Sequence, residues 1–355
     1  MKKWFVAALI ALGPTLVAQT PVPEIAFEGN INPLKLPPDM NFGEVSGVAV
    51  NSKGDVAIYT RNNSAGGPAY GATASQVLLF DKTGKFVREV GKGLYAWSYA
   101  HDVRFDKDDN LWAIDKGSDM IIRFNPEGRV TMVFGRKKEA SDEAEPWTRV
   151  NPPRPPVNGQ FRQPTDVAWD TEGNIYISDG YINSRVAKYD KDGNWVASFG
   201  SYGAERGQFN TLHSIAIDAR DRVYVADRGN RRIQVLDTSG KVLDVYTIDV
   251  PVPPNSPVAI GNRPAETGPG VQTQRPGAPW AICITPPPNQ VMFVSDSYPG
   301  RIYKMSLDGK VLGWLGGSGK TLKKFGWIHE IACPSENELY VAELLNWRAQ
   351  KLLLH

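Results

Sequence analysis

Short apolar runs separated by polar turns recur along almost the whole chain. Each copy reads as apolar–small–apolar, a turn containing Asp, Asn or Gly, a β-rich run, an acidic residue and a third β-rich run. Runs of this length, bounded by turn residues, are typical of antiparallel strands rather than helices. The copies begin at Val48, Val103, Val167, Ile215, Ile282 and Ile331.

The repeated unit has the size of a propeller blade. Its copies are 48 to 67 residues apart, and a hairpin signal such as DKTGK or DKDGN follows five of them. Each unit therefore predicts four short strands, and radial repetition of such sheets predicts an all-β fold, a six-bladed β-propeller. The sixth unit stops after its third strand, RAQKLLLH, so we expect EIAFEGN, residues 24–30, to close the ring.

Composition narrows the setting of this domain. In 355 residues, Gly 34 and Pro 27 favour a turn-rich β protein, and a net charge of +2 gives no reason to propose nucleic acid or a membrane surface as a partner. Residues 1–18, MKKWFVAALIALGPTLVA, have the order of a secretory signal peptide and are short for a membrane span. We expect residues 19–355 to be a secreted or periplasmic monomer.

The two cysteines cannot form a disulfide framework. Cys283 and Cys333 stand one position out of register in neighbouring repeats. We expect them to face opposite sides of their strands, which disfavours a bridge between them.

Three of the four histidines share one position of the repeat, two residues before the first apolar residue. The residues there are Ser46, His101, Thr165, His213, Trp280 and His329. Because inner strands line the channel of a propeller, the three imidazoles should converge on its axis. Three histidines with an open fourth position are typical of catalytic zinc, although imidazole also suits other divalent metals. The alternative is that each histidine caps a strand and satisfies a local backbone group.

Cations and a tyrosine follow the second strand of several units. That strand returns to the histidine end, so Arg61, Lys116, Tyr181 and Arg228 should surround the same mouth. The two arginines and the tyrosine, together with a metal, predict an anion-binding site capable of acid–base chemistry. The alternative is that the arginines lie on the surface and the tyrosine packs a loop. Insertions at residues 136–163 and 250–279 precede the third and fifth units and should overhang this mouth as lids or disordered segments.

Two stretches carry a family resemblance. GQFRQPTDVAW leading to SDGYINSR, and GQFNTLHSIAI leading to ADRGNRRIQ, resemble NHL repeats as arranged in the peptidyl-α-hydroxyglycine α-amidating lyase family. The resemblance implies zinc held by His101, His213 and His329. It implies Tyr181 as the base, with Arg61 and Arg228 as substrate-binding arginines. It also implies a structural calcium held by the backbone carbonyls of Val48 and Val103 and by the carboxylate of Glu330.

The chain departs from that family at three positions near the site. Glu330 replaces an aspartate, Trp327 replaces a methionine and Ile182 stands beside the tyrosine where the family has a cysteine. The calcium could therefore be lost or displaced, and the wall beside the metal is altered.

Two functions compete at this stage. The first is an exported zinc lyase that splits an α-hydroxyglycine-type substrate, which bears a carboxylate, into an amide and glyoxylate. The alternative is a non-catalytic NHL propeller that binds peptide or glycan at its mouth. The shared position of three histidines argues against the alternative, because a binding scaffold needs no metal triad.

Overall fold

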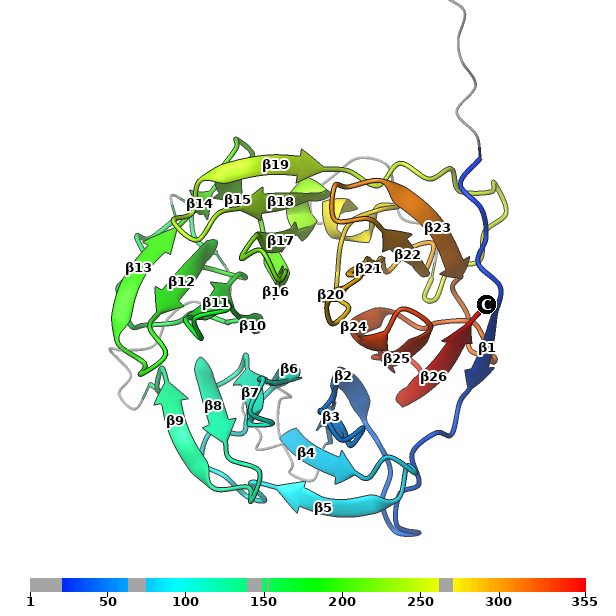
Figure 1. Cartoon of the computed structure of the whole chain (residues 1–355), viewed down its shortest axis with the longest axis horizontal. Coiled ribbons are helices and arrows are strands. Elements are labelled where there is room, and N and C mark those ends of the chain that lie inside the picture. The colour runs from blue at the N-terminus through cyan, green and yellow to red at the C-terminus, as the bar shows by residue number, and fades with distance from the viewer. Residues whose placement is uncertain (1–20, 63–74, 139–148, 152, 262–270) are drawn as a thin grey trace, which may run out of the picture.

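The computed structural model confirms the propeller (Figure 1). It describes residues 21–62, 75–138, 149–151, 153–261 and 271–355, and these form six four-stranded sheets around one axis. The signal peptide predicted at residues 1–18 lies outside the described residues. Within them, no helix is long and apolar enough to cross a membrane.

Each of the first three blades is an up-and-down sheet whose strands follow one another in the chain. The first blade comprises β2 (Glu44–Val50), β3 (Val56–Arg61), β4 (Ser75–Phe80) and β5 (Phe86–Val90). The second comprises β6 (Ala100–Phe105), β7 (Leu111–Asp115), β8 (Met120–Phe124) and β9 (Val130–Phe134). The third comprises β10 (Asp166–Trp169), β11 (Ile175–Asp179), β12 (Arg185–Tyr189) and β13 (Trp195–Phe199).

The other three blades repeat this order, with one exchange at the end. The fourth comprises β16 (Leu212–Ile217), β17 (Val223–Asp227), β18 (Arg232–Leu236) and β19 (Val242–Tyr246). The fifth comprises β20 (Ile282–Ile284), β21 (Met292–Ser295), β22 (Arg301–Met305) and β23 (Val311–Gly316). The sixth comprises β24 (Ile328–Ser335), β25 (Glu338–Glu343), β26 (Arg348–Leu354) and β1 (Phe27–Asn30). Smaller elements are β14 (Ser201–Tyr202), β15 (Gln208–Phe209) and the short 3₁₀ turns η2 (Arg228–Asn230) and η3 (Val271–Gln274).

The N-terminal segment closes the ring, as predicted. β1 pairs antiparallel with β26, from Phe27 opposite Leu354 to Asn30 opposite Lys351. The strand is shorter than the predicted residues 24–30, because Ile25 instead donates its amide to the carbonyl of Trp314 on the fifth blade. The first described segment thus ties two blades together.

The apolar core of the described residues is divided into six clusters, each between two neighbouring blades. Side chains alternate along a strand. The first apolar residue of a unit therefore faces the preceding blade, and the next residue faces the following blade. Ile282, for example, packs in the cluster with Tyr224 of the fourth blade, whereas Cys283 lies in the cluster with Ile331 of the sixth.

The expectation for the cysteines is wrong, since Cys283 and Cys333 form a disulfide with Cα atoms 6.0 Å apart. Equivalent positions of two blades point the same way around the ring. Two residues that face each other across an interface must therefore stand one position out of register. Cys283 points forward from the fifth blade, Cys333 points back from the sixth, and their offset favours the bridge.

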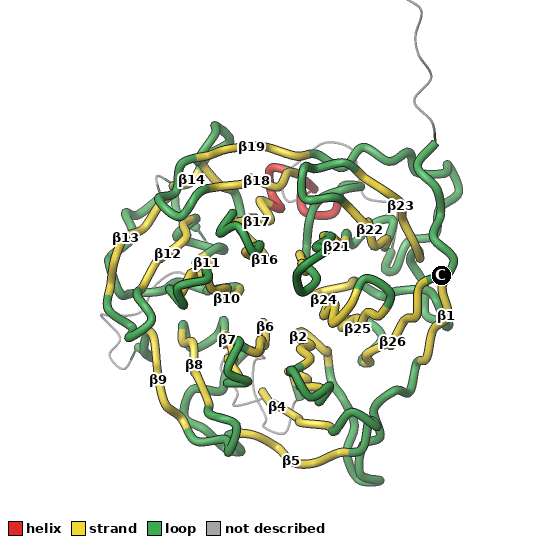
Figure 2. The backbone as a smooth tube through the Cα atoms, in the orientation of Figure 1, coloured by secondary structure: helices red, strands yellow, loops and turns green. Residues whose placement is uncertain are grey.

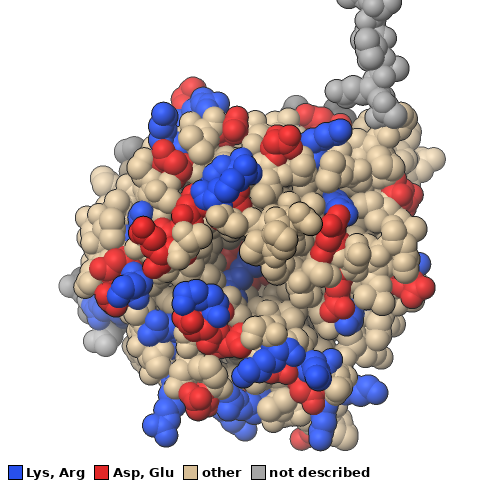
Figure 3. Space-filling model, viewed as in Figure 1, with Lys and Arg blue, Asp and Glu red and all other residues tan. Residues whose placement is uncertain are grey.

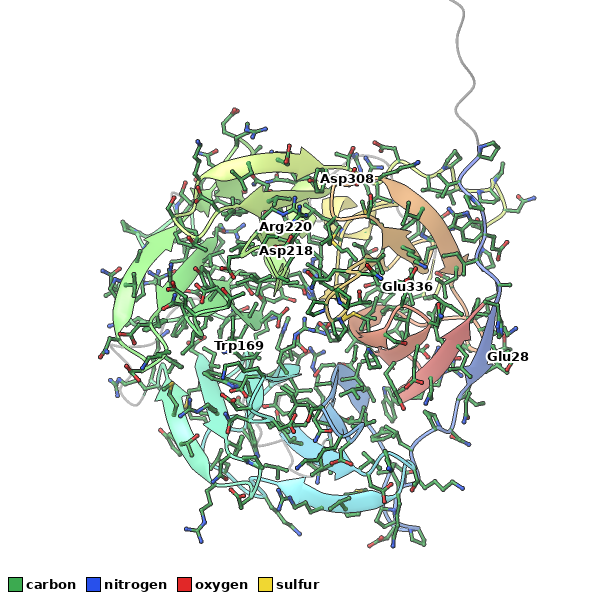
Figure 4. The ribbon with its side chains drawn as sticks, in the orientation of Figure 1. Glu28, Trp169, Asp218, Arg220, Asp308 and Glu336 are labelled. Atoms are coloured by element: carbon green, nitrogen blue, oxygen red, sulfur yellow. A yellow bond between two sulfur atoms is a disulfide. The ribbon has the colours of Figure 1, made fainter. Side chains whose placement is uncertain are left out.

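The radial order of the strands follows their order in the chain in the first five blades, whereas in the sixth β1 lies outermost (Figure 2). Asp218 and Arg220, in the β16–β17 turn, lie near the ring centre, Asp308 in the β22–β23 turn lies farther out, and Glu28 of β1 lies at the rim (Figure 4). Lys and Arg alternate with Asp and Glu over the face seen in Figure 3. The first strand of each blade begins at the far end of the channel from these turns, and the candidate site lies there.

Candidate metal centre and active site

Three buried imidazoles meet on the propeller axis. His101 on β6, His213 on β16 and His329 on β24 are each at most 2% exposed. Their ring centroids are 4.6 to 4.8 Å apart, and one ligand nitrogen from each lies within 4.8 Å of the others. The structure therefore brings together the three histidines that share one position of the repeat.

Each imidazole is anchored to the next blade around the ring. The Nδ1 atoms of His101, His213 and His329 lie 2.7 Å from the carbonyl oxygens of Thr165, Trp280 and Ser46, respectively. Those three acceptors occupy the histidine position in the third, fifth and first blades. Because a carbonyl can only accept, each Nδ1 carries the proton and each Nε2 keeps its lone pair. Each histidine thus satisfies a backbone carbonyl of the neighbouring blade and not a local one, and a second nitrogen on each ring is left for a ligand.

The environment keeps these nitrogens neutral. Burial, together with the nearby cations of Lys116, Arg228 and Arg61, lowers the pKa of all three imidazoles well below its ordinary value. Nε2 of His213 is buried and has no hydrogen-bond partner among the described residues. Three neutral, buried nitrogens with one left unpaired fit the donor set of a three-histidine zinc site.

Tyr181 lies beside the histidines, with its hydroxyl 3.3 Å from Nε2 of His101. It follows β11 after Gly180, where an added Cβ would overlap the carbonyl oxygen of Leu212, so glycine lets the chain carry the tyrosine to the mouth. Arg149, from the insertion at residues 136–163, donates Nη2 to the Tyr181 carbonyl at 2.8 Å. The insertion therefore fixes the backbone of the tyrosine.

Three cations of the mouth share one position of the repeat. In each unit the first apolar residue of the inner strand pairs with a residue of the second strand, and the cation stands three residues after that pairing partner. The three cations are Arg61, Lys116 and Arg228. Nζ of Lys116 is 3.7 Å from the centroid of the Tyr181 ring, and the Arg228 guanidinium carbon is 5.5 Å from it. Burial alone would raise the pKa of the Tyr181 phenol, but these three cations outweigh burial and lower the pKa.

The two arginines differ in how far they are already engaged. Arg61 donates Nε to the Ala100 carbonyl at 2.9 Å and Nη1 to the Glu44 carboxylate at 2.7 Å. Arg228 is 6% exposed and stacks 4.3 Å from the ring of Trp280, and its Nε has no partner among the described residues. Arg228 therefore keeps its buried Nε for an anion, whereas Arg61 already uses Nε and Nη1.

Two tryptophans form an apolar wall beside His213, on the side where Arg228 stacks on Trp280. Trp280 has its ring centroid 5.2 Å from that of His213 and 5.7 Å from that of Trp327. Its indole Nε1 donates to the carbonyl of Thr273 at 2.6 Å, so the insertion at residues 250–279 orients this wall. Sequence reasoning did not assign roles to Trp280 and Lys116, although each shares its repeat position with residues that it did select.

The residues implied for calcium lie one step deeper in the channel. Val48 and Val103 have fully buried side chains in the blade interfaces, so only their carbonyls could serve as ligands. Glu330 forms a second three-ligand cluster with Asp102 and Asp166, whose carboxylate oxygens lie within 4.8 Å of one another. Burial raises the pKa of Asp102, and it raises that of Glu330 to about 7.

Comparisons with known proteins identify the repeat and several similar chains. Residues 209–236, which include His213 and Arg228, match the family model of the NHL repeat. The chain is 26% identical over 240 residues to a probable peptidyl-alpha-hydroxyglycine alpha-amidating lyase of Caenorhabditis elegans, covering 63% of this chain and 64% of that protein. It is 27% identical over 221 residues to the peptidylglycine alpha-amidating monooxygenase of Rattus norvegicus, covering 56% of this chain and 21% of that protein.

A relative with another name matches over a shorter range. NHL repeat-containing protein 3 of Mus musculus is 31% identical over 180 residues, covering 47% of this chain and 46% of that protein. The match therefore spans less than two thirds of each of these three relatives. The likeness to proteins named as amidating lyases supports a lyase-like function at modest identity.

Solved structures share the fold. Virginiamycin B lyase of Staphylococcus aureus aligns with a TM-score of 0.56 and 13% identity over 94% of this chain and 100% of its own. A streptogramin B lyase aligns with a TM-score of 0.55 and 12% identity over 93% of this chain and 98% of its own. At such identity these structures establish the propeller, and the function is argued from the site.

Proposed function

We propose that this protein is an exported zinc-dependent lyase that splits an α-hydroxyglycine-type carbinolamide, R–CO–NH–CH(OH)–COO⁻, into the amide R–CO–NH₂ and glyoxylate. One observation carries the proposal: three inward-facing imidazole nitrogens meet on the axis, with the hydroxyl of Tyr181 3.3 Å from one of them. The relatives named as amidating lyases support the same reaction class. Export rests on the signal-peptide pattern of residues 1–18.

The metal part of the proposal assigns zinc to Nε2 of His101, His213 and His329. Bound there, zinc would act as a Lewis acid on the substrate hydroxyl and lower its pKa. The three backbone carbonyls that accept from Nδ1 hold each ring in the tautomer and orientation that ligation requires.

The substrate carboxylate is assigned to the cationic side of the mouth. Arg228 offers the unpaired Nε described above, and Lys116 adds a second positive charge on the same side of Tyr181. An arginine fork matches a carboxylate in geometry as well as charge. Arg61, held by Glu44 and the Ala100 carbonyl, contributes its charge more than its donors.

Tyr181 is assigned the proton transfers. Its lowered pKa favours the phenolate, which accepts the proton of the substrate hydroxyl at Oη. As the hydroxyl oxygen forms a carbonyl, the C–N bond breaks and its electron pair goes to nitrogen. The phenol then returns the proton to that nitrogen, which releases the amide and glyoxylate and restores the phenolate.

The tryptophan wall is assigned to the remainder of the substrate. Trp280 lies against the Arg228 guanidinium and Trp327 lies beside Trp280, so a substrate with its carboxylate on Arg228 would have the two indoles next to its acyl group R. Apolar walls with a few polar groups are typical of small-molecule sites. The proposed substrate therefore has an apolar acyl group, either a peptide end or a small analogue.

A glyoxylate-release assay tests the proposal. Metal-free protein would be incubated with a panel of α-hydroxyglycine derivatives, with and without one equivalent of zinc. We expect glyoxylate and amide in equal amounts, with zinc required, and faster release when R is apolar. Zinc binding without glyoxylate from any member of the panel would favour the non-catalytic propeller that binds a ligand at its mouth.

A further inference from the structure

Arg104 breaks the repeat at a position that lies in the channel wall. The residue after the first apolar residue is small in the other five units, namely Ala49, Ala168, Ala216, Cys283 and Ala332. In the second unit it is a long cation. Small residues there face the next blade, so Arg104 must direct its side chain from the second blade toward the third.

Arg104 reaches the carboxylates of the deeper cluster. Its Nε and Nη2 donate to the two oxygens of Asp166 at 2.9 and 2.7 Å, a bidentate pair. Nη2 also lies 3.0 Å from Oε1 of Glu330 and 3.6 Å from Oδ2 of Asp102. The three acid side chains are at most 2% exposed and that of Arg104 is 14% exposed, so the ion pairs are shielded from water.

The same acids also hold the backbone of their own strands. The amides of Val103, Val167 and Ile331 donate to Asp102, Asp166 and Glu330 at 2.7, 2.8 and 2.9 Å, respectively. Ser214 connects the fourth blade to this cluster. Its hydroxyl donates to Asp166 at 2.8 Å and lies 3.4 Å from Nη2 of Arg104. One guanidinium thus joins side chains of the second, third, fourth and sixth blades.

This arrangement does not suit the calcium that the resemblance implies. Calcium takes six to eight oxygen ligands. Oε1 of Glu330 already forms an ion pair with the guanidinium of Arg104 and accepts a hydrogen bond from the amide of Ile331. A divalent cation on Glu330 would stand beside the positive charge of Arg104, and it would compete with that charge for the same carboxylates.

We infer that Arg104 is the built-in cation of this channel and takes the place of a structural calcium, so that the propeller is held together without one. A tethered guanidinium cannot be removed by a chelator, whereas a bound ion can. The inference concerns the stability of the ring and needs neither zinc nor turnover, so its failure and that of the proposed function are measured separately.

Thermal unfolding of the full chain tests this inference, in EGTA and in millimolar calcium chloride, with zinc absent from both. We expect the Tm of the unaltered protein to be the same in the two solutions. Arg104→Met leaves the three buried acid side chains without their cation, so its Tm in EGTA should fall on the order of 5–10 °C. Calcium should recover part of that loss, because the emptied cluster then offers oxygen ligands.

Arg220→Met is the matched control. Arg220 lies in the β16–β17 turn with a side chain 67% exposed, and it is 3.7 Å from Asp218 (Figure 4). We expect it to unfold like the unaltered protein in both solutions. If Arg104→Met does not fold, Arg104→Lys replaces it in the test, because lysine keeps the positive charge but lacks the bidentate guanidinium. We expect the Tm of Arg104→Lys to be independent of calcium.

Two outcomes would overturn the inference. One is an unaltered protein whose Tm falls in EGTA and returns with calcium. The other is an Arg104→Met variant that matches the unaltered protein in EGTA. Isothermal titration with calcium chloride gives a second readout, with heat of binding expected for Arg104→Met and none for the unaltered protein.

Discussion

Two clusters of three potential metal ligands lie next to each other on the inner strands. They share β6 and β24 and differ in the third strand, which is β16 for His213 and β10 for Asp166. His101 and His329 belong to the upper cluster, and the residues that follow them, Asp102 and Glu330, belong to the lower one. In the upper cluster each ring is neutral and turns a lone pair toward the axis. In the lower cluster the carboxylates converge on Arg104, which the chain itself supplies.

The difference shows how one fold can offer a proposed site for an exchangeable ion beside a site filled by a cation of the chain. At the upper cluster the cations of the chain, such as Lys116 and Arg228, lie against the rings of Tyr181 and Trp280 and do not occupy the centre between the three imidazoles. At the lower cluster a single residue in a small-residue position fills the centre. A shift of one residue along β6 and β24, with β10 in place of β16 as the third strand, changes the ligand chemistry within the same ring of blades.

We expect the largest effect from removing one imidazole of the upper cluster, because zinc binding and glyoxylate release should both be lost. His213→Ala leaves two of three ligands, so we expect zinc content to fall from about one per chain to near zero and zinc affinity to fall by more than about 100-fold. Glyoxylate release should be lost, while the Tm stays close to that of the metal-free unaltered protein because the core is apolar packing between blades. Metal analysis by mass spectrometry and the glyoxylate assay measure both.

His355→Ala is the control for this substitution. His355 lies outside the channel with a side chain 58% exposed, and its loss should change neither zinc content nor turnover. A His213→Ala protein that retains full zinc would show that the upper cluster is not the metal centre.

Removing one hydroxyl should separate the chemistry from the metal. Tyr181→Phe keeps the ring against His101, so zinc content should persist while kcat falls by about 10²–10⁴-fold, the usual loss for a general base. The loss should fall on kcat more than on KM. Tyr95→Phe, at a tyrosine that is 61% exposed, should leave both constants unchanged. Unchanged turnover in Tyr181→Phe would move the base to another group.

Removing one rim cation should have a smaller effect that depends on pH. Lys116 is among the cations that lower the pKa of Tyr181, so Lys116→Met should raise that pKa and move the acidic limb of the pH–rate profile to higher pH. Each unit of that shift reduces the phenolate fraction at neutral pH about tenfold. We expect a loss on the order of tenfold at neutral pH that disappears in alkaline buffer.

The control for Lys116→Met is Lys107→Met, at a side chain that is 74% exposed. It should leave the profile unchanged. A Lys116→Met profile with the limb in its original position, and a uniformly lower rate, would show that Lys116 binds substrate without tuning Tyr181.

The smallest effect expected is the response of zinc binding to mild acid. An ordinary imidazole is half protonated near pH 6.5. Since burial lowers the pKa of His101, His213 and His329, protons should compete with the metal only below that range. Equilibrium dialysis should therefore find the same zinc content at pH 8 and pH 6. Half of the zinc lost above pH 6.5 would contradict the neutral state of this cluster.

The repeat predicted most of the upper cluster because its residues occupy equivalent positions. Once the six units are aligned, His101, His213 and His329 coincide, and strand direction places Tyr181 at the same mouth. Ring closure was predicted for the same reason, since the sixth unit lacks one strand. Residues at equivalent positions of the blades are related by rotation about the propeller axis. Aligning the six units therefore predicts which side chains lie at the same height in the channel.

Contacts between blades, and residues in insertions that occur in one unit alone, could not be predicted from the alignment of the units. The contacts of Arg104 run between blades, and the alignment of units says which residues are equivalent but not which ones face each other. The same limitation caused the error over Cys283 and Cys333, where equivalence was mistaken for contact. The tryptophan wall depends on Thr273, in an insertion that has no counterpart in the other units.

The strand exchange in the sixth blade has a consequence for how the chain reaches its native state. β1 is made first, yet its partner β26 is made last, and the amide of His355 donates to the carbonyl of Ala26 at 3.0 Å. During synthesis β1 therefore has no strand partner until residues 348–354 emerge, although Ile25 can meet its partner Trp314 as soon as the fifth blade is made. Shortening the chain within β1 or within β26 should then open the ring at one seam instead of trimming a loose end.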